Sequence, residues 1–65
     1  MRRAARLFQI IQHLHHDRVI TARDLAEVLE VSERTIYRDV QDLSLSGVPI
    51  AGEAGVGYRL MRGFH

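Results

Sequence analysis

The sequence lacks cysteine, lysine and tryptophan, and it has a single proline among 65 residues. The absence of cysteine excludes disulfide bonds and metal sites built on thiolates. No apolar run approaches the roughly 20 residues that a membrane-spanning helix needs. The basic N-terminus is also not followed by the continuous apolar block of a signal peptide. We therefore expect a cytoplasmic protein that makes no contact with a membrane.

The sequence shows no pattern typical of an enzyme. A catalytic site needs a nucleophile beside a base, or two carboxylates in one pocket, and Ser44 and Ser46 have no histidine near them in the sequence. A chain of 65 residues forms one domain, buries only about 60% of its unfolded surface and has little room for an enclosed site. We predict one domain over residues 1–65, with no catalytic residue and no cofactor.

The net charge of +1 says little about partners, but every basic residue is an arginine and the charges are unevenly spread. The clusters are Arg2, Arg3 and Arg6, then Arg34 and Arg38, then Arg59 and Arg62, with the acids Asp24, Glu27 and Glu30 between them. This distribution predicts a charge asymmetry on the folded surface. The first cluster allows two interpretations: it contacts nucleic acid, or it belongs to a solvated, disordered terminus.

Residues 3–15 are expected to form an amphipathic helix, because their apolar residues recur at the 3.6-residue period. The apolar face comprises Ala4, Leu7, Ile10, Ile11 and Leu14, and the polar side comprises Arg6, Gln9, Gln12 and His13. Residues 18–21 are rich in β-branched side chains and fit a short edge strand.

A second helix is predicted in the segment TARDLAEVLE, residues 21–30. Thr21 is a good N-cap, and Asp24 completes a capping-box pattern. The inward face is expected to comprise Leu25, Val28 and Leu29.

A third helix is predicted at about residues 33–46, with Ser32 as its N-cap and Glu33 in its first turn. Gly47 is placed as the C-cap, and Pro49 prevents continuation. The inward stripe is Ile36, Val40 and Leu43. Two helices separated by a turn of about three residues have the spacing of a helix-turn-helix.

The remaining segment changes character and predicts a β-hairpin at about residues 50–61. Ile50 and residues 58–61 read as short strands, and the glycines at 52, 55 and 57 mark the turn between them. Strand alternation assigns Tyr58 and Leu60 to the core and Arg59 to the opposite face. We expect Arg59 to contact DNA from the wing, and the alternative is an ordinary solvent-facing residue. The predicted fold is mostly α with a small β-sheet, a winged helix-turn-helix of three helices and a hairpin wing.

The outward face of the third helix is expected to carry hydrogen-bond donors suited to nucleic acid. It holds Arg34, Arg38 and Gln41, with Thr35 and Tyr37 flanking. Arginine can bind guanine and glutamine can bind adenine in a bidentate manner, and hydroxyl groups commonly contact phosphate. The alternative is a solvated face on which Asp42 pairs with Arg38 and Glu30 pairs with Arg34.

Three further features bear on the function. Asp39 lies close to the apolar stripe and fits a structural acid paired with an arginine of another element. His13, His15, His16 and Asp17 could bind a metal, but only two of them share a helix face, so we predict no metal site. The hairpin tip (Ala54, Gly55 and Val56) has no basic side chain, so any contact with DNA there would use backbone N–H groups or shape.

The segment TARDLAEVLEVSERTIYRDVQDLSLSGVPIAGEAGVGYRL resembles the N-terminal DNA-binding domain of DeoR-like and YafY-like bacterial regulators, most closely those that carry a WYL domain further along the chain. The signatures are DLAEVLEVSERTIYRDV, the helix exit LSLSGVPI and the wing GEAGVGYRL. The resemblance implies a winged helix that binds specific double-stranded DNA and regulates transcription. It also implies that DNA is contacted by five residues of the segment SERTIYRD, namely Ser32, Arg34, Thr35, Tyr37 and Arg38.

Regulators of this kind usually continue into an effector or oligomerisation region, so the chain is either an excised DNA-binding domain or an unusually short protein. The effector is unknown. The alternative function is a winged helix used for protein–protein contact or dimerisation, with Phe8 and Leu45 as its exposed apolar residues. Such proteins often bind paired half-sites as homodimers, and a monomer is the other alternative.

Overall fold

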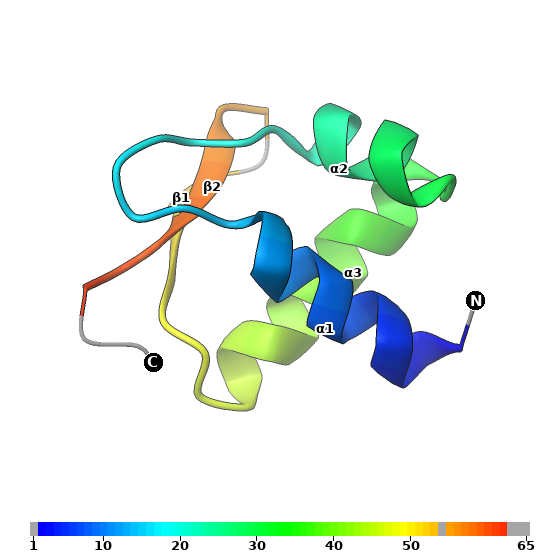
Figure 1. Cartoon of the computed structure of the whole chain (residues 1–65), viewed down its shortest axis with the longest axis horizontal. Helices are drawn as coiled ribbons and strands as arrows, with labels where there is room; N and C mark the ends of the chain where they lie inside the picture. Colours follow the sequence, from blue (N-terminus) through cyan, green and yellow to red (C-terminus); the bar gives the residue numbers. More distant parts are fainter. Residues whose placement is uncertain (1, 54, 63–65) are drawn as a thin grey trace.

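The computed structural model describes residues 2–53 and 55–62, with the side chain of residue 53 excepted. Three helices, α1 (Arg3–His13), α2 (Ala22–Leu29) and α3 (Glu33–Leu45), precede the strands β1 (Ile50–Glu53) and β2 (Gly57–Leu60). The helices gather at one end of the molecule, and the hairpin lies at the other (Figure 1). This arrangement is a winged helix-turn-helix, as predicted. Within the described residues, no helix is both long and apolar enough to cross a membrane.

Hydroxyl side chains begin both helices of the helix-turn-helix, as predicted. Thr21 Oγ1 accepts the backbone N–H of Asp24 at 3.0 Å, and Ser32 Oγ accepts that of Thr35 at 3.1 Å. Each bond satisfies a backbone donor that has no partner within the helix. The predicted capping box at Thr21 is incomplete. Among the hydrogen bonds of the described residues, the Thr21 backbone N–H does not donate to the Asp24 carboxylate.

Left-handed backbone ends both α2 and α3. Glu30 ends α2 at φ 57° and ψ 46°. Gly47 follows the last turn of α3 at φ 102°, and Val48 N–H donates to Leu43 O at 3.0 Å while Gly47 N–H donates to Ser44 O at 3.1 Å. These two bonds form a Schellman motif. Gly47 therefore stops α3, one residue beyond the cap residue Ser46.

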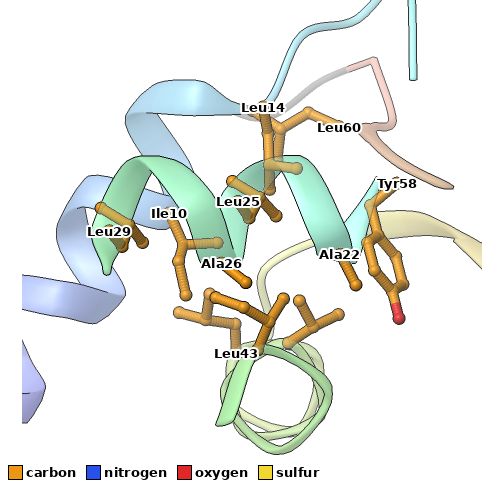
Figure 2. Close-up of a cluster of buried hydrophobic side chains, with 11 residues drawn as sticks. Ile10, Leu14, Ala22, Leu25, Ala26, Leu29, Leu43, Tyr58 and Leu60 are labelled. Atoms are coloured by element: carbon orange, nitrogen blue, oxygen red, sulfur yellow. The ribbon is translucent and has the colours of Figure 1, made fainter. Parts of the chain in front are cut away.

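The core lies where the three helices meet the hairpin. In Figure 2, Leu25 and Ala26 of α2 face Ile10 of α1 and Leu43 of α3, and Tyr58 of β2 lies beside Ala22. The buried apolar residues are Ile10, Leu14, Ala22, Leu25, Ala26, Leu29, Ile36, Val40, Leu43, Tyr58 and Leu60. The predicted burial of Tyr58 and Leu60 is confirmed.

Three predicted placements on the helices are wrong. Val28 is 55% exposed, because the buried stripe of α2 runs through residues 22, 25, 26 and 29 and Val28 lies about 110° away from it around the helix. Ala4 is exposed in the first turn of α1. Arg6, predicted on the polar side of α1, instead forms an ion pair with Asp39 of α3.

The hairpin differs from its prediction in the roles of its glycines. β1 and β2 are antiparallel, with Gly52 opposite Tyr58, so Gly52 and Gly57 lie within strands and Gly55 alone of the three lies in the turn. A Cβ at Gly52 would come within 2.1 Å of Gly57 O, so the glycines allow the strands to approach closely. The predicted edge strand at 18–21 is a single bridge, in which Ile20 and Tyr58 exchange two N–H···O bonds of 2.8 Å.

Candidate nucleic-acid interface

The structure gathers four of the predicted site residues on one exposed face of α3. Arg34, Tyr37, Arg38 and Gln41 are all exposed, on the side of the helix that faces away from the buried Ile36. Tyr37 is 37% exposed. These side chains therefore present two guanidinium groups, an amide and a phenol to solvent along about two turns of helix.

Among the side chains that the structure describes, no acid neutralises either arginine of this face, because none of their ion pairs includes Arg34 or Arg38. The alternative in which Asp42 pairs with Arg38 is wrong, because Asp42 binds Arg3 of α1. The ion pairs of the described side chains do not include Glu30 with Arg34 either; Glu30 is the left-handed residue that ends α2. Two like charges four residues apart are thus left facing solvent.

Ser32 and Thr35 lie at the start of α3, and both are already engaged in capping. Their hydroxyl oxygens lie 3.0 Å apart, and Ser32 Oγ also accepts the Thr35 backbone N–H. Ser32 is exposed and Thr35 is half-buried. Ser32 therefore offers its hydroxyl to a partner more readily than Thr35 does.

Arg59 lies on the face of β2 opposite to Tyr58 and Leu60, but its guanidinium lies against the loop that follows α1. It is half-buried, pairs with Ala51 across the hairpin, and donates from Nη1 to His16 O at 3.5 Å. At the hairpin tip, Val56 is 62% exposed and Gly55 has φ 87°. The predicted tip residue Ala54 lies outside the described residues.

A hollow of about 260 Å³ opens beside the exposed face of α3, between the start of α2, the first turns of α3 and the hairpin. It is lined by Thr21, Ala22, Arg23, Glu33, Tyr37 and Gly55. Tyr37 donates from its hydroxyl to Glu33 Oε1 at 3.4 Å. Arg23 and Glu33 were not among the predicted site residues; the four-residue spacing between Glu33 and Tyr37 was the available signal.

The inner side of α3 is held by a buried ion pair. Arg6 binds Asp39 through Nε and also donates from Nη2 to Asp39 Oδ1 at 3.1 Å. This hydrogen bond raises the pKa of Arg6 above its ordinary value, against the opposing effect of burial. The prediction that Asp39 is a structural acid paired with an arginine of another element is confirmed. The pair ties α1 to the back of the helix whose front carries the candidate site.

The histidines after α1 contribute to packing of the loop against β2. His16 Nδ1 donates to Leu60 O at 3.1 Å, and His15 Nε2 lies 3.0 Å from Arg18 Nη2. Leu60 N–H in turn donates to His15 O at 2.8 Å. In the described part of the chain, no three histidine or acidic side chains come together as metal ligands would.

Comparison with known proteins gives two matches. A family model described as "HTH domain" matches residues 6–59. A protein of Bacillus subtilis (strain 168), described as "Uncharacterized HTH-type transcriptional regulator YobV", is 40% identical over 52 residues. The match covers 80% of this chain and 17% of that protein, so the chain spans about a sixth of its relative's length. No solved structure matches. Resemblance to DeoR-like and WYL-carrying regulators stays a prediction.

Proposed function

Because the chain belongs to the HTH-domain family, we propose that it binds specific double-stranded DNA and serves transcriptional regulation. In this proposal α3 lies in the major groove, and the hairpin lies on the adjacent phosphate backbone. The observation that carries it is the pair Arg34 and Arg38, which are exposed four residues apart with no acidic partner in the described chain. A relative described as a transcriptional regulator supports the same function.

The charge pattern of α3 is easier to explain with an anionic partner than without one. Like charges four residues apart on a helix destabilise it by a few tenths of a kcal/mol. A phosphate backbone or a guanine edge beside the two guanidinium groups turns that repulsion into attraction. Among the described side chains, no acid forms an ion pair with either arginine, and Asp42 binds Arg3.

Each site residue has a proposed role that follows from its chemistry and position. Arg34 and Arg38 bind guanine edges or phosphates, and Gln41 binds an adenine edge. Tyr37 binds the backbone from the flank of the helix. Ser32 and Thr35 hold the start of the helix and contribute lesser contacts, and Arg59 contacts the backbone from the hairpin.

The test begins with duplexes of random sequence titrated at low and moderate salt. We expect the logarithm of the binding constant to fall linearly with the logarithm of the salt concentration, with a slope of about −0.9 per phosphate contacted. The absence of binding at low salt would contradict the proposed function. Selection from a random duplex pool then gives the preferred site.

Arg38→Ala separates base reading from phosphate binding on that selected site. Loss of a bidentate guanine contact should cost about 1–3 kcal/mol and relax the preference at one base pair. Loss of a phosphate contact should instead weaken binding to all sequences alike and lower the salt slope by about 1. Arg62→Ala, outside the helix, is the matched control for charge. Unchanged binding by Arg38→Ala would refute the role given to this residue.

A second candidate function, contact with another protein, is favoured by two exposed apolar side chains. Phe8 on α1 is 62% exposed and Leu45 on α3 is 79% exposed. Large apolar side chains in contact with water mark interaction surfaces when they gather into a patch. Concentration-dependent association that Leu45→Ser abolishes, without any DNA binding, would favour this function over the first.

A further inference from the structure

Glu33 stands out on the proposed DNA-binding surface because its charge has the sign of DNA. It is exposed in the first turn of α3, and it lines the hollow beside Tyr37 and Gly55. The first turns of a recognition helix are the part that approaches base edges in the major groove. An acid at this place repels phosphate, so it lowers affinity for DNA in general.

The described side chains orient the carboxylate of Glu33 but do not neutralise it. The Tyr37 hydroxyl donates to its Oε1 at 3.4 Å. Arg23, which lines the same hollow, instead pairs with Glu27, with 3.4 Å between Nε and Oε1. No ion pair of the described residues includes Glu33. The carboxylate therefore keeps both its charge and acceptor sites that no group of the described chain occupies.

We propose that Glu33 is a specificity-determining residue that accepts a hydrogen bond from the N4 amino group of one cytosine in the major groove. The inference rests on the proposed function, in which α3 enters that groove. A carboxylate accepts from cytosine N4, whereas guanine O6 and thymine O4 are acceptors that repel it, and adenine presents its N7 acceptor beside its N6 donor. Glu33 thus lowers the affinity for most sequences and restores it at sites that place a cytosine opposite its carboxylate. Unfavourable contacts of this kind generate specificity.

The experiment is selection from a random duplex pool with three proteins: the wild type, Glu33→Gln and Glu27→Gln. The wild type is expected to enrich a site that contains one strongly preferred cytosine. Glu33→Gln should lower the preference for cytosine at that position about five- to tenfold, as expected for one base contact, because a glutamine amide also donates and so tolerates guanine and thymine. Preferences at the other positions should stay unchanged.

Glu27→Gln is the matched control, because Glu27 is also an exposed acid but lies on α2 and pairs with Arg23. It should keep the wild-type profile at every position. Tyr37→Phe removes the hydroxyl that orients the carboxylate, so it should lower the same cytosine preference by a smaller factor. Melting curves of each variant confirm that the fold is retained.

The outcomes separate this inference from the proposed function. If Glu33→Gln binds every sequence more tightly but keeps the cytosine preference, Glu33 is only a source of repulsion and the inference is wrong, while the proposed function stands. If the wild type enriches no sequence at all, the proposed function itself fails. A cytosine preference that falls equally in Glu27→Gln would also overturn the inference.

Discussion

Two arginines of α1 bind carboxylates of α3, and they differ sharply in burial. The side chains of Arg6 and Asp39 are 16% and 1% exposed, whereas those of Arg3 and Asp42 are 61% and 32% exposed. Arg6→Ala leaves the Asp39 carboxylate buried without its partner, so we expect a loss of about 3 kcal/mol in the free energy of unfolding. Arg3→Ala should cost less than about 1 kcal/mol, because its partner can reach water. Urea denaturation measures both.

A further variant tests whether the loss comes from the stranded charge. Replacing both Arg6 and Asp39 by apolar residues (Arg6→Met with Asp39→Leu) removes the charge that burial penalises. We expect this double variant to recover most of the stability that Arg6→Ala loses. Equal, small losses for Arg6→Ala and Arg3→Ala would show that the Asp39 carboxylate gains access to water when Arg6 is removed.

The hairpin and the end of α3 both depend on glycine, for different physical reasons. Gly47 has φ 102°, and a Cβ added there would meet no atom within 4 Å. Gly47→Ala should therefore cost about 1–2 kcal/mol, from backbone conformation alone. Gly52→Ala places a Cβ 2.1 Å from Gly57 O, so the strands must separate and the cost should exceed that of Gly47→Ala. Thermal unfolding compares them.

Amide exchange at the hairpin tells the two glycine variants apart. The Tyr58 N–H points away from β1 and donates to Ile20 O at 2.8 Å, so strand alternation directs the N–H of Arg59, which pairs with Ala51, toward β1. Separation of β1 from β2 should expose the Arg59 amide. We expect faster exchange of this amide in Gly52→Ala and unchanged relative protection in Gly47→Ala. Protection that is the same in both variants would mean that the hairpin relaxes around the added methyl group.

The helices and their ends could be predicted from the sequence where interactions within one turn determine them. Cap residues such as Thr21 and Ser32 act within one turn, and Gly47 acts at one backbone position, so the helix ends could be predicted. The exposed face of α3 followed from periodicity in the same way. Which arginine binds which acid across elements could not be predicted, because residues 3 and 42 come together only through the packing of α1 on α3. That packing is why Arg6 lies on the inner side, and why Asp42 does not bind Arg38.

The dimensions of the molecule bear on how many copies a DNA site takes. Its principal extents are 28 × 23 × 17 Å, whereas half-sites one helical turn apart are about 34 Å from centre to centre. If DNA is bound as proposed, one copy reads one half-site and a palindromic site takes two copies. Native mass spectrometry with a selected palindrome and with its half should give two copies and one copy, respectively. One copy bound per palindrome would contradict this.

Tyr58 connects the parts of the fold, because it lies in the core and exchanges backbone bonds with Ile20. Burial, reinforced by the charge of Tyr37, raises the pKa of Tyr58 above its ordinary value, which is about 10. The folded state therefore favours the neutral phenol. Its contribution to stability is complete below about pH 10 and is lost as the pH rises from there through the raised pKa, since the unfolded chain ionises first.

We therefore expect the free energy of unfolding of the wild type to decline above about pH 10. That of Tyr58→Phe should decline less steeply, because phenylalanine has no proton to lose. Urea denaturation at a series of alkaline pH values measures both slopes. Tyr37→Phe is the matched control and should keep most of the decline, because Tyr58 is still present. If Tyr58→Phe declines as steeply as the wild type, ionisation of this phenol does not couple the hairpin to the stability of the whole fold.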